Sequence, residues 1–201
     1  MMQSRYDNND TLNQILEFNK KSNSYVYGIV VNGRLDTELN DFVNNYHLSD
    51  PKSFIKYGGG VCWDWTSYEA YVFRKYFPSI PFNTYYIVCD DGNMCPTHTF
   101  LTFQLNGDIY YFESAFYQYR GVYKANSLSD IFNFVITNMA VHYRKNDNLR
   151  LLKYPFYIIK YNATNPHIFG MGVEQFMQWC FNQTHVNHQY SPHFNMPVKI
   201  K

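Results

Sequence analysis

Apolar side chains follow two periods along this chain, one typical of helices and one typical of strands. Helical spacing predicts helices over 11–19, 36–46, 62–77, 127–135 and 173–181. Runs rich in β-branched and aromatic residues predict extended segments over 25–31, 84–89, 97–105, 108–115 and 155–162. Asn-Gly pairs at 32–33 and 106–107 mark tight turns. Helices therefore flank an antiparallel run of strands, which is the pattern of an α+β fold.

No linker or internal repeat divides the sequence into separate parts. We expect a single domain over 1–201, with a core over about 24–162. The expected extensions of this core are an N-terminal helix capped by Asp10, a C-terminal helix and a loose tail from Thr184 onward.

The predicted helix over 62–77 is apolar on almost every side, with Trp65, Tyr71 and Phe73 spread around it. Such a helix is normally buried in the centre of a domain. Three glycines at 58–60 precede it, and glycine permits unusual dihedral angles and close approach of two backbones. We therefore expect a central buried helix that packs on the antiparallel sheet.

Cys62 opens this helix and is the candidate nucleophile. The free N–H groups and partial positive charge at a helix N-terminus stabilise a thiolate, the reactive form of cysteine. The same N–H groups can stabilise an oxyanion. Position alone leaves a second interpretation open, in which Cys62 is a buried structural cysteine.

His98 and Glu113 are the candidate base and orienting acid. If 106–107 forms a two-residue turn, His98 lies opposite Ala115 and Glu113 lies opposite Phe100. His98 and Glu113 then share one sheet face as diagonal neighbours, within reach of each other. A carboxylate there selects the tautomer that leaves the other ring nitrogen for a nucleophile. A one-residue bulge would instead turn Glu113 away.

Several segments resemble those of transglutaminase-like cysteine proteins, within the papain-like superfamily. YGGGVCWD over 57–64 is similar to the family's nucleophile segment. HTF over 98–100, a glycine turn and YYFE over 110–113 resemble its histidine and acid strands. The stretches 27–28 and 46–51 are similar to those of small bacterial and phage members. The order cysteine, histidine, acid is that of the family.

The resemblance implies a transglutaminase-like core and a triad of Cys62, His98 and Glu113. It also implies that Gly60 and Trp63 support the cleft and the oxyanion site, although Trp63 would serve equally to fill the core. The implied activity is acyl transfer on an amide bond of a protein or peptide substrate, without a cofactor. We expect a protease or deamidase rather than a crosslinking enzyme, because nothing indicates a site that shields the thioester from water.

The chain departs from the family at the acid, which is usually aspartate, because Glu113 is one methylene longer. Its aromatic surroundings also match no particular substrate group. The alternative function is therefore a catalytically inactive binding module that keeps the fold.

Composition narrows the range of partners and compartments. A formal net charge of +1 without a basic stripe argues against nucleic acid. The longest apolar run, over 25–31, is too short to span a membrane, and the polar N-terminus lacks a secretory signal. Four cysteines without disulfide or metal spacing indicate a reducing, cytoplasmic compartment, although delivery to another cell is compatible with the same sequence. Nothing in the sequence indicates an oligomeric state.

Two further features have ordinary explanations. Asp64 lies in the first turn of the predicted helix, where the helix dipole favours an acid. The histidines at 185, 188 and 193 near Cys180 lack a Cys-x-x-Cys pair, so we expect no metal site there.

Overall fold

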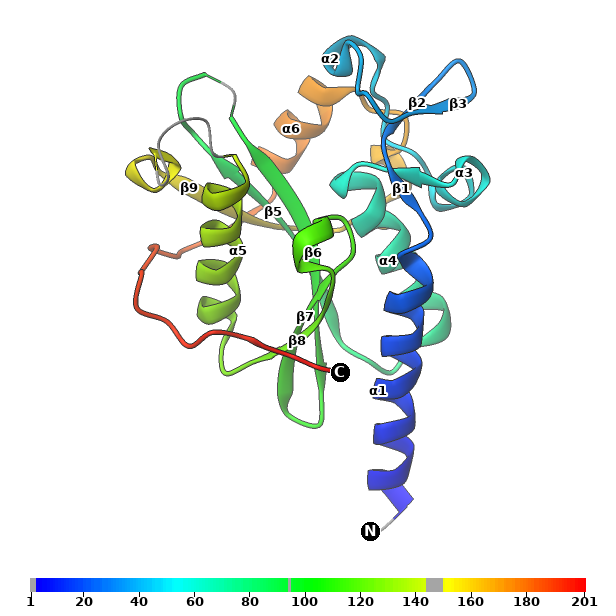
Figure 1. Cartoon of the computed structure of the whole chain (residues 1–201), viewed down its shortest axis with the longest axis vertical. Helices are drawn as coiled ribbons and strands as arrows, with labels where there is room; N and C mark the ends of the chain where they lie inside the picture. The colour runs from blue at the N-terminus through cyan, green and yellow to red at the C-terminus, as the bar shows by residue number, and fades with distance from the viewer. Residues whose placement is uncertain (1–2, 94, 144–149) are drawn as a thin grey trace.

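Over residues 3–93, 95–143 and 150–201, which the computed structural model describes, the chain forms six α-helices and a seven-stranded antiparallel sheet (Figure 1). The strand order is β10-β9-β5-β6-β7-β8-β11. The strands are β5 (Phe82–Cys89), β6 (Thr97–Leu105), β7 (Asp108–Glu113), β8 (Gly121–Ala125), β9 (Phe156–Tyr161), β10 (Thr184–Val186) and β11 (Val198–Lys199). The predicted α+β class is confirmed.

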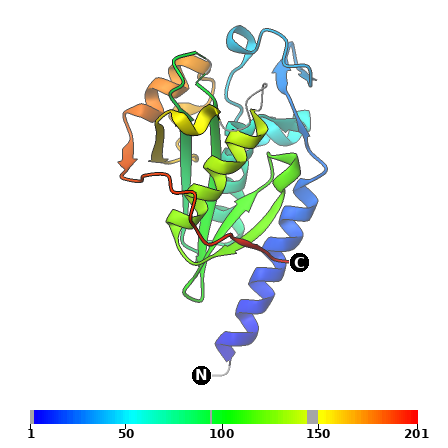
Figure 2. The ribbon, with the colours of Figure 1, turned by 60° about the vertical axis from the view of Figure 1, so that its left-hand side comes forward.

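Helices cover both faces of this sheet. The helices are α1 (Gln3–Ser22), α2 (Phe42–Asn45), α3 (Pro51–Tyr57), α4 (Cys62–Tyr76), α5 (Leu128–His142) and α6 (Val173–Phe181). Leu101 and Phe103 of β6 belong to the apolar cluster that contains α4, α3 and parts of α1 and α6. Phe100 of β6 and Tyr111 of β7 point the other way, into a second cluster with α5. Figures 1 and 2 show α4 and α5 on opposite sides of the strands.

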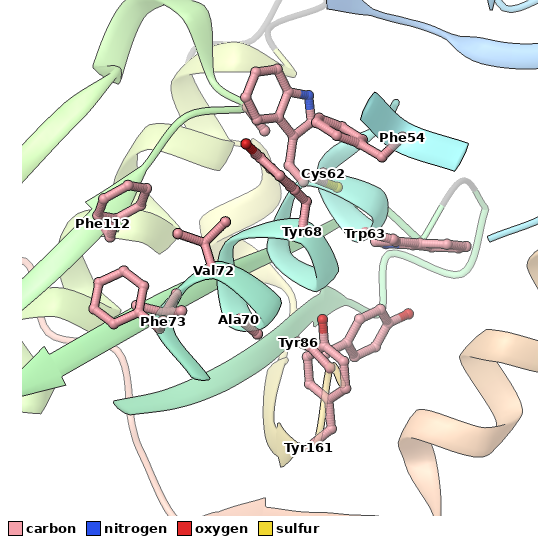
Figure 3. Packing of buried hydrophobic residues seen from close by; sticks show 14 of the residues in the cluster. Phe54, Cys62, Trp63, Tyr68, Ala70, Val72, Phe73, Tyr86, Phe112 and Tyr161 are labelled. Atoms are coloured by element: carbon pink, nitrogen blue, oxygen red, sulfur yellow. The ribbon is translucent and has the colours of Figure 1, made fainter. Parts of the chain in front are cut away.

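The helix α4 is the centre of the larger cluster, as predicted. Trp65 and Phe73 are fully buried, and Phe73 packs on Phe103 of β6 with ring centroids 5.3 Å apart. Figure 3 shows Phe73 beside Phe112 of β7, 5.6 Å away between centroids. Aromatic pairs of this kind bury large areas and fix their relative orientation.

The hairpin of β6 and β7 has the register that the sequence predicts. Asn106 and Gly107 have φ angles of 56° and 82°, as a type I′ turn requires. Leu101 pairs with Phe112, so no bulge interrupts the ladder before it reaches the end of β7. This register determines the face of the sheet on which the Glu113 side chain lies.

A short parallel pair holds the segment before α4. Strand β1 (Val26–Tyr27) pairs with β4 (Gly59–Gly60), and the Val26 N–H donates to the Gly58 carbonyl at 2.9 Å. A Cβ at residue 59 would lie 1.9 Å from the Val26 carbonyl oxygen. Glycine is therefore required for the two backbones to approach this closely.

Several element boundaries differ from the sequence prediction. The helix over 36–46 is wrong, because only α2 forms there and β3 (Arg34–Asp36) pairs with β2 (Ile29–Val31). The Asp36 carboxylate accepts the N–H groups of Glu38 and Asn40, which competes with helix formation.

Two more differences arise at helix starts. The helix α1 begins at Gln3, so Asp10 lies inside it rather than at its N-cap. The unpredicted helix α3 begins at Pro51, which is favourable at the first helical position, and Asp50 caps it by accepting from Lys52 and Ser53.

The C-terminal tail is not loose in the structure. It supplies β10 at one edge of the sheet and β11 at the other. Between them it crosses α5 (Figure 2), where the Asn133 side chain contacts His188 and the Asn195 N–H donates to Asp130. The tail therefore completes the sheet and covers α5.

We expect Gly59→Ala to lower the free energy of unfolding by about 1–3 kcal/mol, because the added methyl group forces β1 and β4 apart. Gly172→Ala is the matched control, since its Cβ would meet its nearest neighbour at 3.7 Å, and it should cost less than about 1 kcal/mol. Urea denaturation measures both. Equal losses of unfolding free energy in Gly59→Ala and Gly172→Ala would show that the close approach of β1 and β4 does not contribute to stability.

Candidate active site

Cys62 and His98 meet at one end of the sheet, where a helix and a strand both begin. Cys62 is the first residue of α4, and His98 follows Thr97 at the start of β6. The two side chains share a hydrogen bond and line one pocket. Cys62 is 6% exposed and His98 is 1% exposed, so a small open surface leads to the sulfur while the imidazole is enclosed.

Glu113 holds the imidazole from the other side. Nε2 of His98 and Oε2 of Glu113 are 2.8 Å apart, and both side chains are buried. Because Nε2 faces the carboxylate, Nδ1 is the nitrogen left for the Cys62 thiol. The structure thus brings together the three residues predicted as a triad, and the hairpin register is the reason.

The Glu113 carboxylate has further partners. Oε1 accepts the backbone N–H groups of Ala115 and Phe116 at 2.7 and 2.8 Å, and Oε2 also accepts the Tyr111 hydroxyl. The Phe116 ring lies 4.2 Å from the His98 ring between centroids. Both side chains of the pair are therefore held in one orientation by packing and hydrogen bonds.

Electrostatics favour the charged form of this pair. Burial alone would lower the pKa of His98, but the Glu113 charge and the hydrogen bonds from Cys62 and Glu113 raise it to about 10. Burial alone would raise the pKa of Glu113, but His98, Tyr111 and Phe116 bring it below its usual value. At neutral pH the site therefore holds an imidazolium beside a carboxylate.

Tyr27 is a site residue whose role the sequence analysis did not identify. Its hydroxyl hydrogen-bonds both the thiol and the backbone N–H of Cys62. The pairing of Tyr27 with Gly60 places it there. Although 39% of the residue is exposed, enclosure of its hydroxyl end and the neighbouring Cys62 raise the pKa of Tyr27 well above its usual value. The only sequence signal was the Tyr27-Gly28 stretch that resembles the family.

Gly60 and Trp63 lie beside the nucleophile but outside the pocket lining. A Cβ at Gly60 would meet Cβ of Asp64 at 2.4 Å, and the Gly60 carbonyl accepts from the Trp65 indole at 3.1 Å. Trp63 is buried and packs on Phe176 of α6, with ring centroids 4.6 Å apart. Its indole nitrogen has no hydrogen-bond partner within the described chain.

Asp64 fastens the chain around the start of α4. Its carboxylate accepts the Val61 N–H at 2.8 Å, the Ser49 N–H at 2.7 Å and the Tyr46 hydroxyl at 3.2 Å. Burial raises the pKa of Asp64 to about 7, although these hydrogen bonds oppose the shift. Asp64 thus caps the helix and anchors the preceding loop.

Glu69 lies on α4 about one and a half turns after Asp64, and it is another buried carboxyl near the triad. Burial and the Glu113 charge raise the pKa of Glu69 well above its usual value, which favours its neutral form. Its side chain hydrogen-bonds Ser114, while Oε1 has no partner among the residues described. A neutral Glu69 adds no second carboxylate charge beside Glu113.

The pocket in front of Cys62 has a volume of about 420 Å³. Its walls come from β1, Leu39 between β3 and α2, the start of β6, the segment 115–118 after β7, and the end of α5. The segment includes Tyr117, the first residue of a short 3₁₀-helix, and α5 contributes His142. Within the described chain, five separate parts therefore meet in front of the thiol.

The other three cysteines lie outside the lining of this pocket. Burial raises the pKa of Cys89 to about 12 and also raises that of Cys180 and Cys95. Within the ranges that the structure describes, no cluster of three or more His, Cys, Asp or Glu side chains is placed to hold a metal ion. In the same ranges, no helix is long and apolar enough to cross a membrane.

No family model, no curated protein and no solved structure matches this chain.

We expect wild-type protein to lose more stability between pH 6.5 and 10 than Glu113→Gln does. Folded His98 keeps its proton up to a pKa of about 10, whereas the unfolded chain releases it near 6.5. This contribution is complete below pH 6.5 and is lost as the pH rises through about 10. Glutamine removes the anion that raises the His98 pKa, and with it most of this dependence.

Urea denaturation at both pH values measures the difference. Glu17→Gln is the control, because Glu17 is exposed and pairs only with the exposed Lys20 in a surface ion pair of 3.1 Å. A pH dependence that is identical in wild type and Glu113→Gln would show that Glu113 does not hold the proton on His98.

Proposed function

We propose that this protein is a cysteine-dependent enzyme that transfers an acyl group from an amide, with Cys62, His98 and Glu113 as its triad. The observation that carries this proposal is the continuous contact from the thiol through the imidazole to a carboxylate, at the wall of a pocket. A nucleophile, a base and an orienting group in this order are what covalent acyl transfer needs. A transglutaminase-like core is the fold we propose for it.

In the first half of the reaction, the Cys62 thiolate attacks the carbonyl carbon of the bound amide. A tetrahedral oxyanion forms, and it collapses with cleavage of the C–N bond. The leaving amine or ammonia takes the proton from His98, which leaves a thioester on the sulfur and a neutral imidazole. Glu113 keeps the ring oriented and stabilises its charged form throughout.

In the second half, neutral His98 takes a proton from water as the water attacks the thioester. The thiolate leaves when the second tetrahedral oxyanion collapses, and the product departs as a carboxylate while His98 is again protonated. We propose hydrolysis rather than crosslinking, because Cys62 lines a pocket whose mouth residues Tyr27, Tyr117 and Tyr143 are exposed, so water can enter from the mouth.

The oxyanion needs donors aimed at the place where its charge develops. The backbone N–H of Cys62 is one such donor, at the positive end of α4. The Tyr27 hydroxyl contacts both that N–H and the thiol, so it borders the space that the substrate oxygen would occupy. We assign Tyr27 as the second donor, in place of Trp63.

An inactive binding module is the second candidate, and one observation favours it. The Tyr27 hydroxyl accepts the same Cys62 N–H that the oxyanion would require. A hydroxyl that never leaves this position would block acyl transfer and would keep the pocket as a binding site.

We expect iodoacetamide at pH 6 to alkylate Cys62 at least about ten-fold faster than the other three cysteines. The His98 imidazolium and the N-terminus of α4 both favour the reactive thiolate form of Cys62, whereas burial raises the pKa of Cys89, Cys95 and Cys180. Peptide mass spectrometry after timed quenching measures the four rates in one sample.

His98→Ala should remove most of the rate at Cys62 and leave the rate at Cys95, the partly exposed reference thiol, unchanged. Slow alkylation of Cys62 in the wild type, at the rate of Cys95, would exclude the enzyme and leave the binding module.

We expect Tyr27→Phe to lower the rate of Cys62 acylation by an activated ester about 10²–10³-fold, because one oxyanion donor is lost. The plateau rate of iodoacetamide alkylation should stay within about three-fold of the wild type, because that displacement forms no oxyanion. Rapid-quench mass spectrometry follows both reactions on the same sulfur.

The two roles considered for Tyr27 give opposite results in this experiment. A donor slows acylation when it is removed, whereas a blocking hydroxyl speeds acylation when it is removed. Equal rates in both proteins would show that Tyr27 has neither role. Tyr76→Phe, at an exposed tyrosine at the far end of α4, is the matched control.

A further inference from the structure

The wall of the pocket in front of Cys62 is uncharged over the described part of the chain, apart from the catalytic pair. Leu39, Ala115 and Phe116 supply apolar surface, and Thr97 and Gln118 supply neutral polar groups. No Asp, Glu, Lys or Arg belongs to this described lining. Among the described residues of this lining, a charged substrate group that entered would lose its water and would find no charged partner except the catalytic pair.

The second imidazole of the described lining, that of His142, does not change this balance. Burial and the positive charge on His98 lower the pKa of His142, so His142 is neutral at neutral pH. Its ring packs on Phe116 with centroids 5.0 Å apart. His142 thus acts as part of an aromatic surface.

Arg120, a described arginine at the pocket mouth, has partners outside the pocket lining. Arg120 donates to the Ser114 carbonyl at 2.6 Å and to the Asn23 carbonyl at 3.3 Å, and its guanidinium lies 5.3 Å from the Trp65 ring centre. It also contacts the Tyr117 ring at 5.5 Å, from outside the pocket lining. Arg120 therefore braces the pocket mouth through Ser114, Asn23 and Tyr117, and it does not line the pocket.

Exposed tyrosines gather at the mouth. Tyr117 is 78% exposed, and Tyr27 and Tyr143, from two other parts of the chain, are 39% and 37% exposed. All three line the same pocket. Large aromatic side chains that converge from separate elements and remain open to solvent mark a binding surface, where rigid rings bind with little loss of conformational entropy.

We propose that this pocket selects a peptide with an aromatic or large aliphatic side chain next to the carbonyl that Cys62 attacks, and that it disfavours acidic and basic side chains there. This assignment rests on the proposed function. The volume of about 420 Å³ is near the lower end of the ~300–1,000 Å³ range of ligand pockets, which suits one or two side chains rather than an extended chain.

Peptidyl vinyl sulfones test the assignment, because they bond covalently to an active-site sulfur. The panel varies only the residue next to the reactive group, as Phe, Leu, Gln, Glu or Lys. Intact-mass spectrometry gives the second-order rate of Cys62 modification in the full chain at pH 7. We expect the Phe and Leu reagents to react at least ten-fold faster than those with Glu and Lys, with Gln between them.

Variants of Gln118 test whether the wall sets this selectivity. Gln118→Lys should raise the rate of the Glu reagent and lower that of the Lys reagent, and Gln118→Glu should do the reverse. The matched control is Gln14→Lys, at an exposed position of α1 outside the pocket. It should leave the wild-type order of rates unchanged.

The outcomes separate the two proposals. If iodoacetamide alkylates Cys62 rapidly but the Glu or Lys reagent matches or exceeds the Phe reagent, the substrate assignment is wrong and the proposed enzyme stands. If Cys62 reacts with neither iodoacetamide nor any vinyl sulfone, both proposals fail. An unchanged preference in the Gln118 variants would place the selectivity outside this wall and overturn the assignment.

Discussion

The buried contact between His98 and Glu113 is the constraint on which the rest of the site depends. Two charges removed from water destabilise a fold unless each has an opposite partner and its remaining hydrogen-bonding atoms are satisfied. Glu113 meets this condition through two backbone N–H groups, a tyrosine hydroxyl and the imidazole. Neutral Glu69 completes the arrangement, because a second anion beside Glu113 would have no cation to balance it.

The same constraint explains why so many elements end at the pocket. Glu113 is the last residue of β7, so the chain can turn immediately and return the N–H groups of Ala115 and Phe116 to its own carboxylate. Cys62 is the first residue of α4, where the backbone N–H groups have no acceptor within the helix. The chemistry is thus built at ends of regular elements, where backbone groups bond to side chains instead of to their own element, while the apolar sheet and α4 supply the rigid support.

Much of this arrangement could be predicted from local sequence. The Asn-Gly turn determined the hairpin register and therefore the meeting of His98 and Glu113, and the apolar run after the glycines identified α4. The helix expected over 36–46 failed because the Asp36 side chain binds nearby N–H groups, a competition that apolar periodicity does not register. Tyr27 was missed as a site residue because its approach to Cys62 depends on parallel pairing between segments more than 30 residues apart.

The path of the tail has a consequence for the order in which the molecule is built. Strands β8 and β9 receive their outer neighbours from residues 198–199 and 184–186, which ribosomes add after every other strand of the sheet. Until then both margins of the sheet present unpaired N–H and C=O groups, which are templates for pairing with another chain. The candidate catalytic residues are therefore made before either edge of the sheet is covered, and the segment 184–199 then removes the aggregation hazard first on one edge and then on the other.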